Sequence, residues 1–290
     1  RRKDCSFRSV EKDPREPVKV CVLGTGSAGN SILVEAGRTR VLVDAGFSGR
    51  DLERRLACVG LLPESIHAIV ITHDHGDHTR GAGVFSRRHG TPVYITPRTL
   101  AACPKIFRGD EPVVAYQAAS PFTIGQIRIE PFLTIHDAAD PVAVALVDEE
   151  TDTRVGVATD LGRPTAQIRL ALNGSDFLIL EANHDEVLLR NGPYPWSVQQ
   201  RIASSHGHLS NHAAARFACE LLHSRLTGVL LAHLSQECNR PELASQVVGD
   251  ALRARGFEGF LDVALQNEPT EFIDIEELRR RTGPAQLSLL

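Results

Sequence analysis

The segment 72–78, Thr-His-Asp-His-Gly-Asp-His, concentrates side chains that bind metal ions. Its four candidate ligands are His73, His75, Asp77 and His78. Imidazole nitrogens and carboxylate oxygens are ligands that zinc, iron and manganese accept. In extended chain the first two histidines point to the same side of the backbone, and Gly76 lets the next two ligands turn toward a second position. The segment therefore suits two adjacent metal ions better than a solvated polar turn.

Two metal ions need more ligands than this segment holds, and polar residues after later apolar runs supply candidates. His136, Asp160 and His233 each directly follow a short run rich in Val, Ile, Leu or Ala. Taken singly, each residue has an ordinary alternative interpretation, an aspartate in a turn or a histidine exposed to solvent. Because each ends an apolar run, we expect all three at one rim of the sheets, beside segment 72–78.

The elements that must position these residues are short strands and a few helices. Runs of Val, Ile and Leu bounded by Gly predict strands at 18–23, 31–35, 40–44, 68–72, 93–95, 127–135, 142–147, 155–159, 177–180, 229–232 and 261–265. Helical spacing and capping residues predict helices at 48–60, 83–89, 211–224 and 241–255. Two strand-rich halves with helices outside predict a sandwich of two sheets covered by helices on both outer faces.

Domain organisation follows from composition. No linker rich in Pro, Gly or Ser divides the 290 residues, so we expect a mobile N-terminal arm at 1–16, a single domain at 17–276 and a C-terminal tail at 277–290. A weak internal echo joins the two halves: Val-Leu-Val-Asp44-Ala-Gly and Val-Ala-Thr-Asp160-Leu-Gly both end an apolar strand in Asp-x-Gly.

The metal motif, with the three later ligands, resembles the metallo-β-lactamase superfamily, whose α/β (α+β) fold is a four-layered αββα sandwich. Four further motifs resemble the YycJ/WalJ-type branch, whose members are bacterial cytoplasmic DNA exonucleases. These are Leu23-Gly-Thr-Gly-Ser-Ala-Gly-Asn-Ser31, Glu181-Ala-Asn-His-Asp185, Gly207-His-Leu-Ser-Asn211 and Leu231-Ala-His-Leu-Ser-Gln236. The resemblance extends from about residue 18 to about residue 275.

The resemblance implies two divalent metal ions, zinc or manganese. The first ion would be held by His73, His75 and His136, the second by Asp77, His78 and His233, with Asp160 bridging. Two cations about 3.5–4 Å apart would hold the attacking and leaving oxygens of an in-line displacement at phosphorus. A bound water with its pKa lowered to about 7 would supply hydroxide, which Asp77 could orient. Asp44 is implied as a support behind the ligands.

His208 is a second catalytic candidate, because a predicted helix begins directly after it and free N–H groups at helix starts favour phosphate. It would contact the scissile phosphate or protonate the leaving oxygen; the alternative is a structural histidine bonded to backbone. Ser210 or Asn211 would cap that helix. Glu181 would order the site or touch substrate, and His184 is a weaker candidate of the same kind.

These residues predict a metal-dependent phosphodiesterase. The resemblance implies a more specific activity, that of a 5′-to-3′ DNA exonuclease, and favours DNA over RNA as the substrate. The alternative keeps the fold and hydrolyses a small ester, thioester or lactam. Six cations follow the metal segment and either contact phosphate or form an ordinary solvated face. They are Arg80, Arg87, Arg88, Arg98, Lys105 and Arg108.

Other classes are disfavoured. Gly24-Thr-Gly-Ser-Ala-Gly29 matches the dinucleotide fingerprint, but two β-rich runs follow it where a helix is required, so we expect no nicotinamide or flavin cofactor. The net charge of −4 excludes nucleic-acid binding by bulk charge. No apolar run is long enough to span a bilayer or serve as a signal peptide, and the six cysteines form no Cys-x-x-Cys pair, which favours a cytoplasmic protein with no membrane partner.

Overall fold

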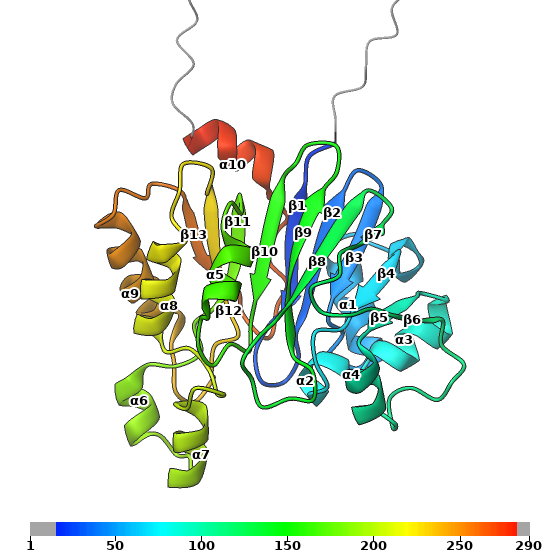
Figure 1. Ribbon diagram of the computed structural model, residues 1–290, viewed down its shortest axis with the longest axis horizontal. Coiled ribbons are helices and arrows are strands. Elements are labelled where there is room, and N and C mark those ends of the chain that lie inside the picture. Colours follow the sequence, from blue (N-terminus) through cyan, green and yellow to red (C-terminus); the bar gives the residue numbers. More distant parts are fainter. Residues whose placement is uncertain (1–15, 283–290) are drawn as a thin grey trace, which may run out of the picture.

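The computed structural model describes residues 16–282, which fold into two facing β-sheets with helices on both outer sides (Figure 1). The expected N-terminal arm, 1–16, lies outside the described residues except for Glu16. The predicted four-layered αββα sandwich is confirmed.

The first sheet has the strand order β14-β1-β2-β3-β4-β5-β6. Its strands are β1 Lys19–Gly24, β2 Ser31–Ala36, β3 Thr39–Val43, β4 Ala68–Val70, β5 Val93–Ile95, β6 Val113–Ala115 and β14 Ile273–Asp274. β2 and β3 form the antiparallel hairpin that was predicted to follow the Gly-rich segment in place of a helix, and β1 pairs antiparallel with β2. β3, β4 and β5 are parallel, so their carboxyl ends meet at one edge of the sheet.

The second sheet has the strand order β13-β12-β11-β10-β9-β8-β7. Its strands are β7 Phe122–Ile124, β8 Ile127–Leu133, β9 Val142–Asp148, β10 Arg154–Ala158, β11 Phe177–Glu181, β12 Gly228–Ala232 and β13 Phe260–Val263. β10, β11 and β12 are parallel neighbours, and β8 runs in the same direction across β9. β13 is also parallel to β12, so five strands of this sheet run toward the same rim.

Helices cover both sheets. They are α1 Gly49–Cys58, α2 Gly76–Thr79, α3 Ala82–His89, α4 Pro97–Ala102, α5 Ala166–Leu172, α6 Glu186–Asn191, α7 Trp196–Ile202, α8 Asn211–Glu220, α9 Pro241–Arg253 and α10 Ile275–Thr282, with a 3-10 turn at Pro63–Ser65. One apolar core lies between the sheets, and two more lie under the helices on either side. This three-core arrangement is why strands such as β9 are buried on both faces and read as continuous apolar runs.

Several short elements were not predicted, because strands of two or three residues and helices of four to eight carry too few residues to show a clear period. They are α2, α4, α5, α6, α7, β6, β7, β14 and α10. The helix predicted at 211–224 ends at Glu220. The tail expected at 277–290 is wrong at its start, since α10 continues to Thr282, with Ile275 fully buried and Leu278 packed on the core between the sheets.

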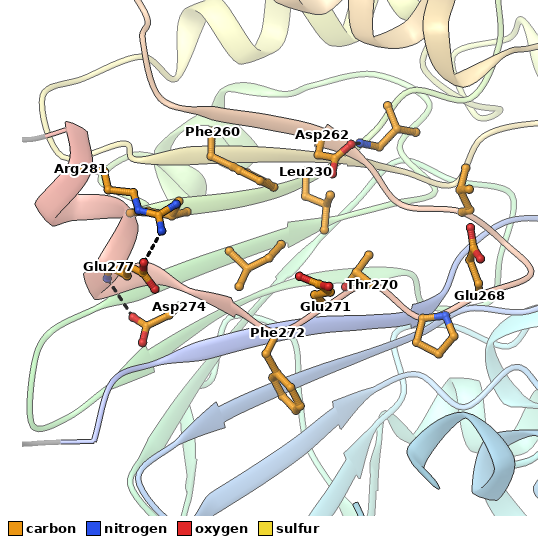
Figure 2. Close-up of a pocket in the computed structure, with 15 residues that line it drawn as sticks. Leu230, Phe260, Asp262, Glu268, Thr270, Glu271, Phe272, Asp274, Glu277 and Arg281 are labelled. Carbon is orange, nitrogen blue, oxygen red and sulfur yellow. Dashed lines mark hydrogen bonds and ion pairs between the residues drawn. The ribbon is translucent and has the colours of Figure 1, made fainter. Parts of the chain in front are cut away.

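α10, β13 and β14 border a groove of about 600 Å³ where the two sheets separate (Figure 2). Phe260 and Leu230 form part of its apolar floor, while Asp262, Glu271 and Asp274 give it an acidic wall. None of the candidate metal ligands lines this groove. None of the helices between residues 16 and 282 is both long and apolar enough to cross a bilayer.

Candidate metal centre

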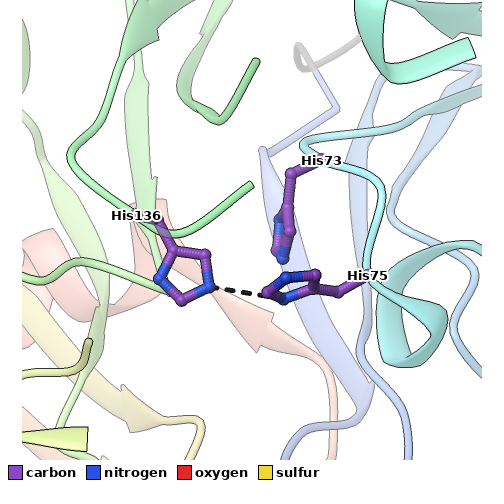
Figure 3. A group of neighbouring side chains, drawn as sticks. All are labelled: His73, His75 and His136. Carbon is purple, nitrogen blue, oxygen red and sulfur yellow. Dashed lines mark hydrogen bonds between the residues drawn. The ribbon is translucent and has the colours of Figure 1, made fainter. Parts of the chain in front are cut away.

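Three histidines from two sheets meet at the rim where the parallel strands end. His73 and His75 lie on the loop after β4, and His136 lies on the loop after β8. Figure 3 shows the three rings directed at a common point. His75 Nδ1 lies 3.3 Å from His136 Nε2. A tetrahedral zinc with bonds of about 2.0–2.1 Å separates its ligand atoms by roughly 3.3–3.4 Å, so this spacing fits one ion.

The other ring nitrogens of these histidines are held by oxygen atoms. His136 Nδ1 lies 3.1 Å from the carbonyl oxygen of Gly207, and His75 Nε2 lies 3.2 Å from that of Asp137. A carbonyl only accepts, so each of these nitrogens carries the proton and leaves the opposite nitrogen free to bind a metal. His73 is 2% exposed, and its Nε2 is buried without a hydrogen-bond partner.

A second group forms beside the first. Asp77, His78 and His233 bring their ligand atoms within 4.8 Å of one another. Asp77 Oδ2 lies 3.5 Å from His78 Nε2 and 3.6 Å from His233 Nε2. The Nδ1 of His78 lies 2.7 Å from Asp44 Oδ2, so its Nε2 faces the cluster.

Asp160 lies between the two groups and is 3% exposed. Its Oδ2 is 3.1 Å from His78 Nε2, and its Oδ1 is 3.6 Å from His136 Nε2 and 3.7 Å from His233 Nε2. One carboxylate thus reaches a histidine of the first group and two of the second. This is the placement that a bridging ligand requires.

Glu181, at the end of β11, is fully buried behind the ligands. Its Oε1 lies 3.0 Å from His233 Nδ1 and 2.8 Å from His208 Nδ1. It also accepts hydrogen bonds from three backbone N–H groups, those of Asp160, Leu161 and Leu209. Glu181 therefore orients two imidazoles and two loops at once.

Three residues that the sequence analysis did not single out support the ligands. Thr72 donates two hydrogen bonds to the Asp44 carboxylate, one from its hydroxyl and one from its backbone N–H. The Asn30 amide lies 3.0 Å from His78 Nε2 and donates to Asp77 Oδ2. Thr25 Oγ1 accepts the backbone N–H of His233. Thr25 and Asn30 stand in the Gly-rich motif 23–31, so that motif is the signal that points to them.

Backbone conformation sets the direction of three supporting or ligating side chains. Asp44, Asp160 and His233 have φ values of 64°, 54° and 57°, in the left-handed region that non-glycine residues rarely adopt. Each lies within two residues of a strand end, at the rim where the ligand groups and their supports meet. Such strain persists where the surrounding structure over-determines it, and it concentrates at functional sites.

The electrostatics of the cluster favour bound cations. Burial lowers the pKa of His233, but Asp160, Asp77 and Glu181 outweigh burial and raise that pKa to about 10. Burial likewise opposes ionisation of Glu181, yet His208 and His233 lower its pKa to about 2. Buried carboxylates are ionised here and demand compensating positive charge, which protons supply in the absence of metal ions.

The donor set fits divalent metal ions. Two buried ring nitrogens, His73 Nε2 and His233 Nε2, have no hydrogen-bond partner and face the cluster. Buried polar atoms are rarely left unsatisfied, so such atoms require an explanation, and a bound ion is one. Histidine nitrogen with carboxylate oxygen suits zinc and manganese alike.

The remaining candidates divide into two sets. His208 lines the cluster, with its ring 5.1 Å from that of His136 and its side chain 20% exposed. His184 is buried and joins none of the ligand groups found among residues 16–282. Ser210 caps α8 by accepting the Ala213 N–H, while the Asn211 amide pairs with Asn239. Neither Ser210 nor Asn211 belongs to a ligand group there.

The expected row of cations is largely engaged elsewhere. Arg87 pairs with Glu111, Arg88 pairs with Glu53, and Arg80 donates to the carbonyl of Ala28. Arg98, Lys105 and Arg108 are exposed and make no side-chain ion pair within the described part of the chain. They lie on or after α4, whose loop touches the metal segment where the Cys103 thiol contacts the carbonyl of Asp74.

Comparison with known proteins agrees with this architecture. Residues 39–229 match the family described as beta-lactamase superfamily domain. Exodeoxyribonuclease YycJ of Bacillus anthracis is 34% identical over 239 residues, which cover 81% of this chain and 89% of that protein. Exodeoxyribonuclease WalJ of Streptococcus pneumoniae is 35% identical over 240 residues, covering 81% and 88%. The solved metallo-beta-lactamase fold protein YhfI from Bacillus subtilis has a TM-score of 0.67 at 21% identity, covering 88% of this chain and 100% of that one.

The two-sheet sandwich, the cluster of histidine and aspartate at its rim and these matches lead to the same assignment. The chain belongs to the metallo-β-lactamase superfamily, among proteins related to the YycJ and WalJ exodeoxyribonucleases.

Proposed function

We propose that this protein is a metal-dependent DNA exonuclease that cleaves phosphodiester bonds in the 5′-to-3′ direction. The observation that carries the proposal is the pair of adjacent ligand groups joined by Asp160, in a chain related to two exodeoxyribonucleases over 81% of its length. The polarity, and DNA in place of RNA, come from the family resemblance.

Two divalent ions, zinc or manganese, fit the two groups. His73 Nε2, His75 Nδ1 and His136 Nε2 would hold the first, and Asp77, His78 Nε2 and His233 Nε2 the second, with Asp160 reaching both. When bound, such ions lower the pKa of water and neutralise charge on a phosphate. Asp44 and Glu181 keep the imidazoles of His78 and His233 in the orientation that presents Nε2.

His208 is proposed as the proton donor to the leaving oxygen. Burial lowers the pKa of His208, but the adjacent Glu181 carboxylate outweighs burial and raises it, which favours the protonated ring. Glu181 holds the Nδ1 side of the ring, which leaves Nε2–H to donate. Cleavage of a phosphodiester leaves an alkoxide that needs a proton, and a positioned imidazolium supplies it.

Removal of single ligands tests the proposal. We expect His75→Ala and Asp160→Asn, purified with zinc or manganese present, to digest end-labelled single-stranded DNA more than about 100-fold more slowly than wild type. This exceeds the loss typical for a residue that supports a ligand, about 10- to 100-fold. Metal content by elemental analysis is expected to fall in parallel.

The matched control is His67→Ala, because His67 is exposed and lies before β4, at the end of the strand opposite the cluster. Wild-type activity in both ligand variants would contradict the proposal. Activity on chromogenic thioesters or lactams without activity on phosphodiesters would replace it with the small-substrate alternative.

A further inference from the structure

The two short helices α6 and α7 form an excursion, residues 186–207, that leaves the metal rim and returns to it; we call it the α6–α7 hairpin. It starts after the segment that carries Glu181 and ends at Gly207, whose carbonyl oxygen lies 3.1 Å from His136 Nδ1. Figure 1 shows both helices extending beyond the end of the sheets. A chain path tied to the cluster at both ends places its surface beside the metal centre.

Trp196, the single tryptophan of the chain, is the first residue of α7 and is 71% exposed. No ring stacks on it, and no hydrogen bond holds its indole, within the described part of the chain. An indole is among the most costly side chains to leave in water, because its burial removes a large apolar area. Val187 on α6 is also exposed, at 60%.

Trp196 lies at the start of α7, one helix length from the end of α7 that contacts the backbone of His208. Ile202, at the other end of α7, accepts the backbone N–H of His208, so that end of the helix is one hydrogen bond from the cluster. Seven residues of helix span about 10 Å. Consecutive phosphates of one DNA strand are spaced by about 3.4 Å along the helix axis, so this length corresponds to a few nucleotides.

Cations lie on the same hairpin. Arg190, on α6, is exposed and has no ion pair within residues 16–282, and Arg201, on α7, is exposed and pairs with Asp137 beside His136. An exposed aromatic ring and exposed arginines on one surface element are the features by which proteins hold single-stranded nucleic acid, since bases stack on the ring and phosphates pair with guanidinium groups.

We propose that the α6–α7 hairpin binds the single-stranded part of the nucleic acid a few nucleotides from the scissile phosphate, with Trp196 stacked on a base. The inference rests on the proposed function and assigns this chain a strand-binding surface outside the metal ligands. Because stacking tolerates every base, the surface supports progress along the strand without sequence preference.

Kinetics on two substrates test this role. We expect Trp196→Ala to lower kcat/KM for a single-stranded oligonucleotide by about 5- to 100-fold, the loss expected from one stacked base, mainly through KM. Its activity on bis(4-nitrophenyl) phosphate, which cannot reach the hairpin, should equal that of wild type. Trp196→Phe keeps an aromatic face and should recover most of the oligonucleotide activity.

Leu62→Ala is the matched control, since Leu62 is 72% exposed but lies in the loop before β4, at the end of the strand far from the rim. The Leu62→Ala variant should have wild-type activity on both substrates. Unchanged oligonucleotide kinetics in Trp196→Ala, or equal losses on both substrates, would overturn the inference.

Intrinsic fluorescence gives a test without turnover, because all tryptophan emission comes from Trp196. A phosphorothioate oligothymidylate added to metal-loaded wild-type protein should quench this emission over the concentration range in which the anisotropy of the same labelled oligonucleotide rises. Emission that stays constant while DNA binds would overturn the inference. Emission that changes only with protein concentration would also overturn it, and would show that Trp196 lies in an interface between copies of the chain. Wild-type protein that hydrolyses neither substrate would overturn the proposed function instead, and the titration would still locate the strand.

Discussion

At the scale of single residues, the centre depends on groups that hold the ligands as much as on the ligands. Glu181 contacts two imidazoles and three backbone N–H groups from a fully buried position. The family resemblance points to this glutamate, but no spacing in the chain shows that one carboxylate connects His208 with His233. That connection makes Glu181 the most informative supporting residue to change.

Glu181→Gln keeps the shape of the side chain and removes its charge. We expect metal affinity and nuclease activity to fall by about 10- to 100-fold, because the amide has one acceptor oxygen where the carboxylate has two and lacks the negative charge that fixes the imidazoles. Elemental analysis after dialysis against limiting metal, and the rate of DNA digestion, measure the two losses. Full metal content and wild-type activity in this variant would show that the carboxylate is dispensable.

The same glutamate makes a pH-dependent contribution to stability in metal-free protein. Its pKa is about 2 in the folded state against 4.5 as the ordinary value, so the unfolded chain binds the proton more readily. The stabilisation is complete above about pH 4.5 and is lost as the pH falls toward 2. Urea unfolding of wild type and Glu181→Gln should therefore give free energies of unfolding that converge between pH 7 and pH 3, and a constant difference would refute the assignment.

At the scale of elements, the echo between the two halves has a structural meaning. Asp44 and Asp160 both end a strand in the left-handed conformation, and each is followed two residues later by a glycine. A Cβ on Gly46 would lie 1.6 Å from the carbonyl oxygen of Asp77, and one on Gly162 would lie 2.2 Å from that of Ser205. Both glycines let a strand end pack directly on a neighbouring backbone.

Substitution of Gly46 is therefore expected to damage fold and site together. Gly46→Ala must displace the backbone of Asp77. Such overpacking is expected to lower the free energy of unfolding by at least about 1–3 kcal/mol, and the variant should also bind less metal. Gly76→Ala is the control in the neighbouring segment after β4, since a Cβ there meets nothing within 4 Å and the change should stay within about 0.5 kcal/mol. Urea unfolding of both variants decides, and equal stabilities would contradict the packing argument.

At the scale of the whole molecule, the cluster joins the two sheets. The loops after β3 and β4 bring ligands and supports from the first sheet, and those after β8, β10 and β12 bring ligands from the second. Ions bound across this rim connect the two sheets through contacts that the unfolded chain does not have. Binding to the folded state alone stabilises it in proportion to the logarithm of the free metal concentration.

Metal removal should thus lower the melting temperature. At a free zinc or manganese concentration about a thousandfold above Kd, the stabilisation is about 4 kcal/mol, which corresponds to a shift on the order of 10 °C for a chain of this size. Differential scanning calorimetry with chelator and with graded metal measures it. Asp160→Asn, which loses the residue that reaches both groups, should show a much smaller shift, and the same melting temperature for metal-free and metal-loaded wild type would contradict the arrangement.

The sequence predicts features that depend on neighbouring residues better than features that depend on contacts between distant segments. Local patterns were sufficient for most strands and for the sandwich, because the period of buried strands is readable over a few residues. They also point to the candidate ligands in segment 72–78, through the chemistry of a His-x-His-x-Asp-His loop. Contacts between distant segments were not readable. Asn30 on Asp77 and Glu181 beneath two imidazoles depend on strand register and on side-chain direction across the rim.

The sequence by itself determined which side chains were available to bind metal and that they follow strands. The family resemblance already implied two ligand groups with Asp160 between them. Only the tertiary structure decided that Glu181 contacts both His208 and His233, that Asn211 pairs with Asn239, and that Trp196 is exposed. The physical reason is that a ligand atom binds through its position relative to atoms tens or hundreds of residues away. Packing of the two sheets sets those positions, and no local pattern encodes them.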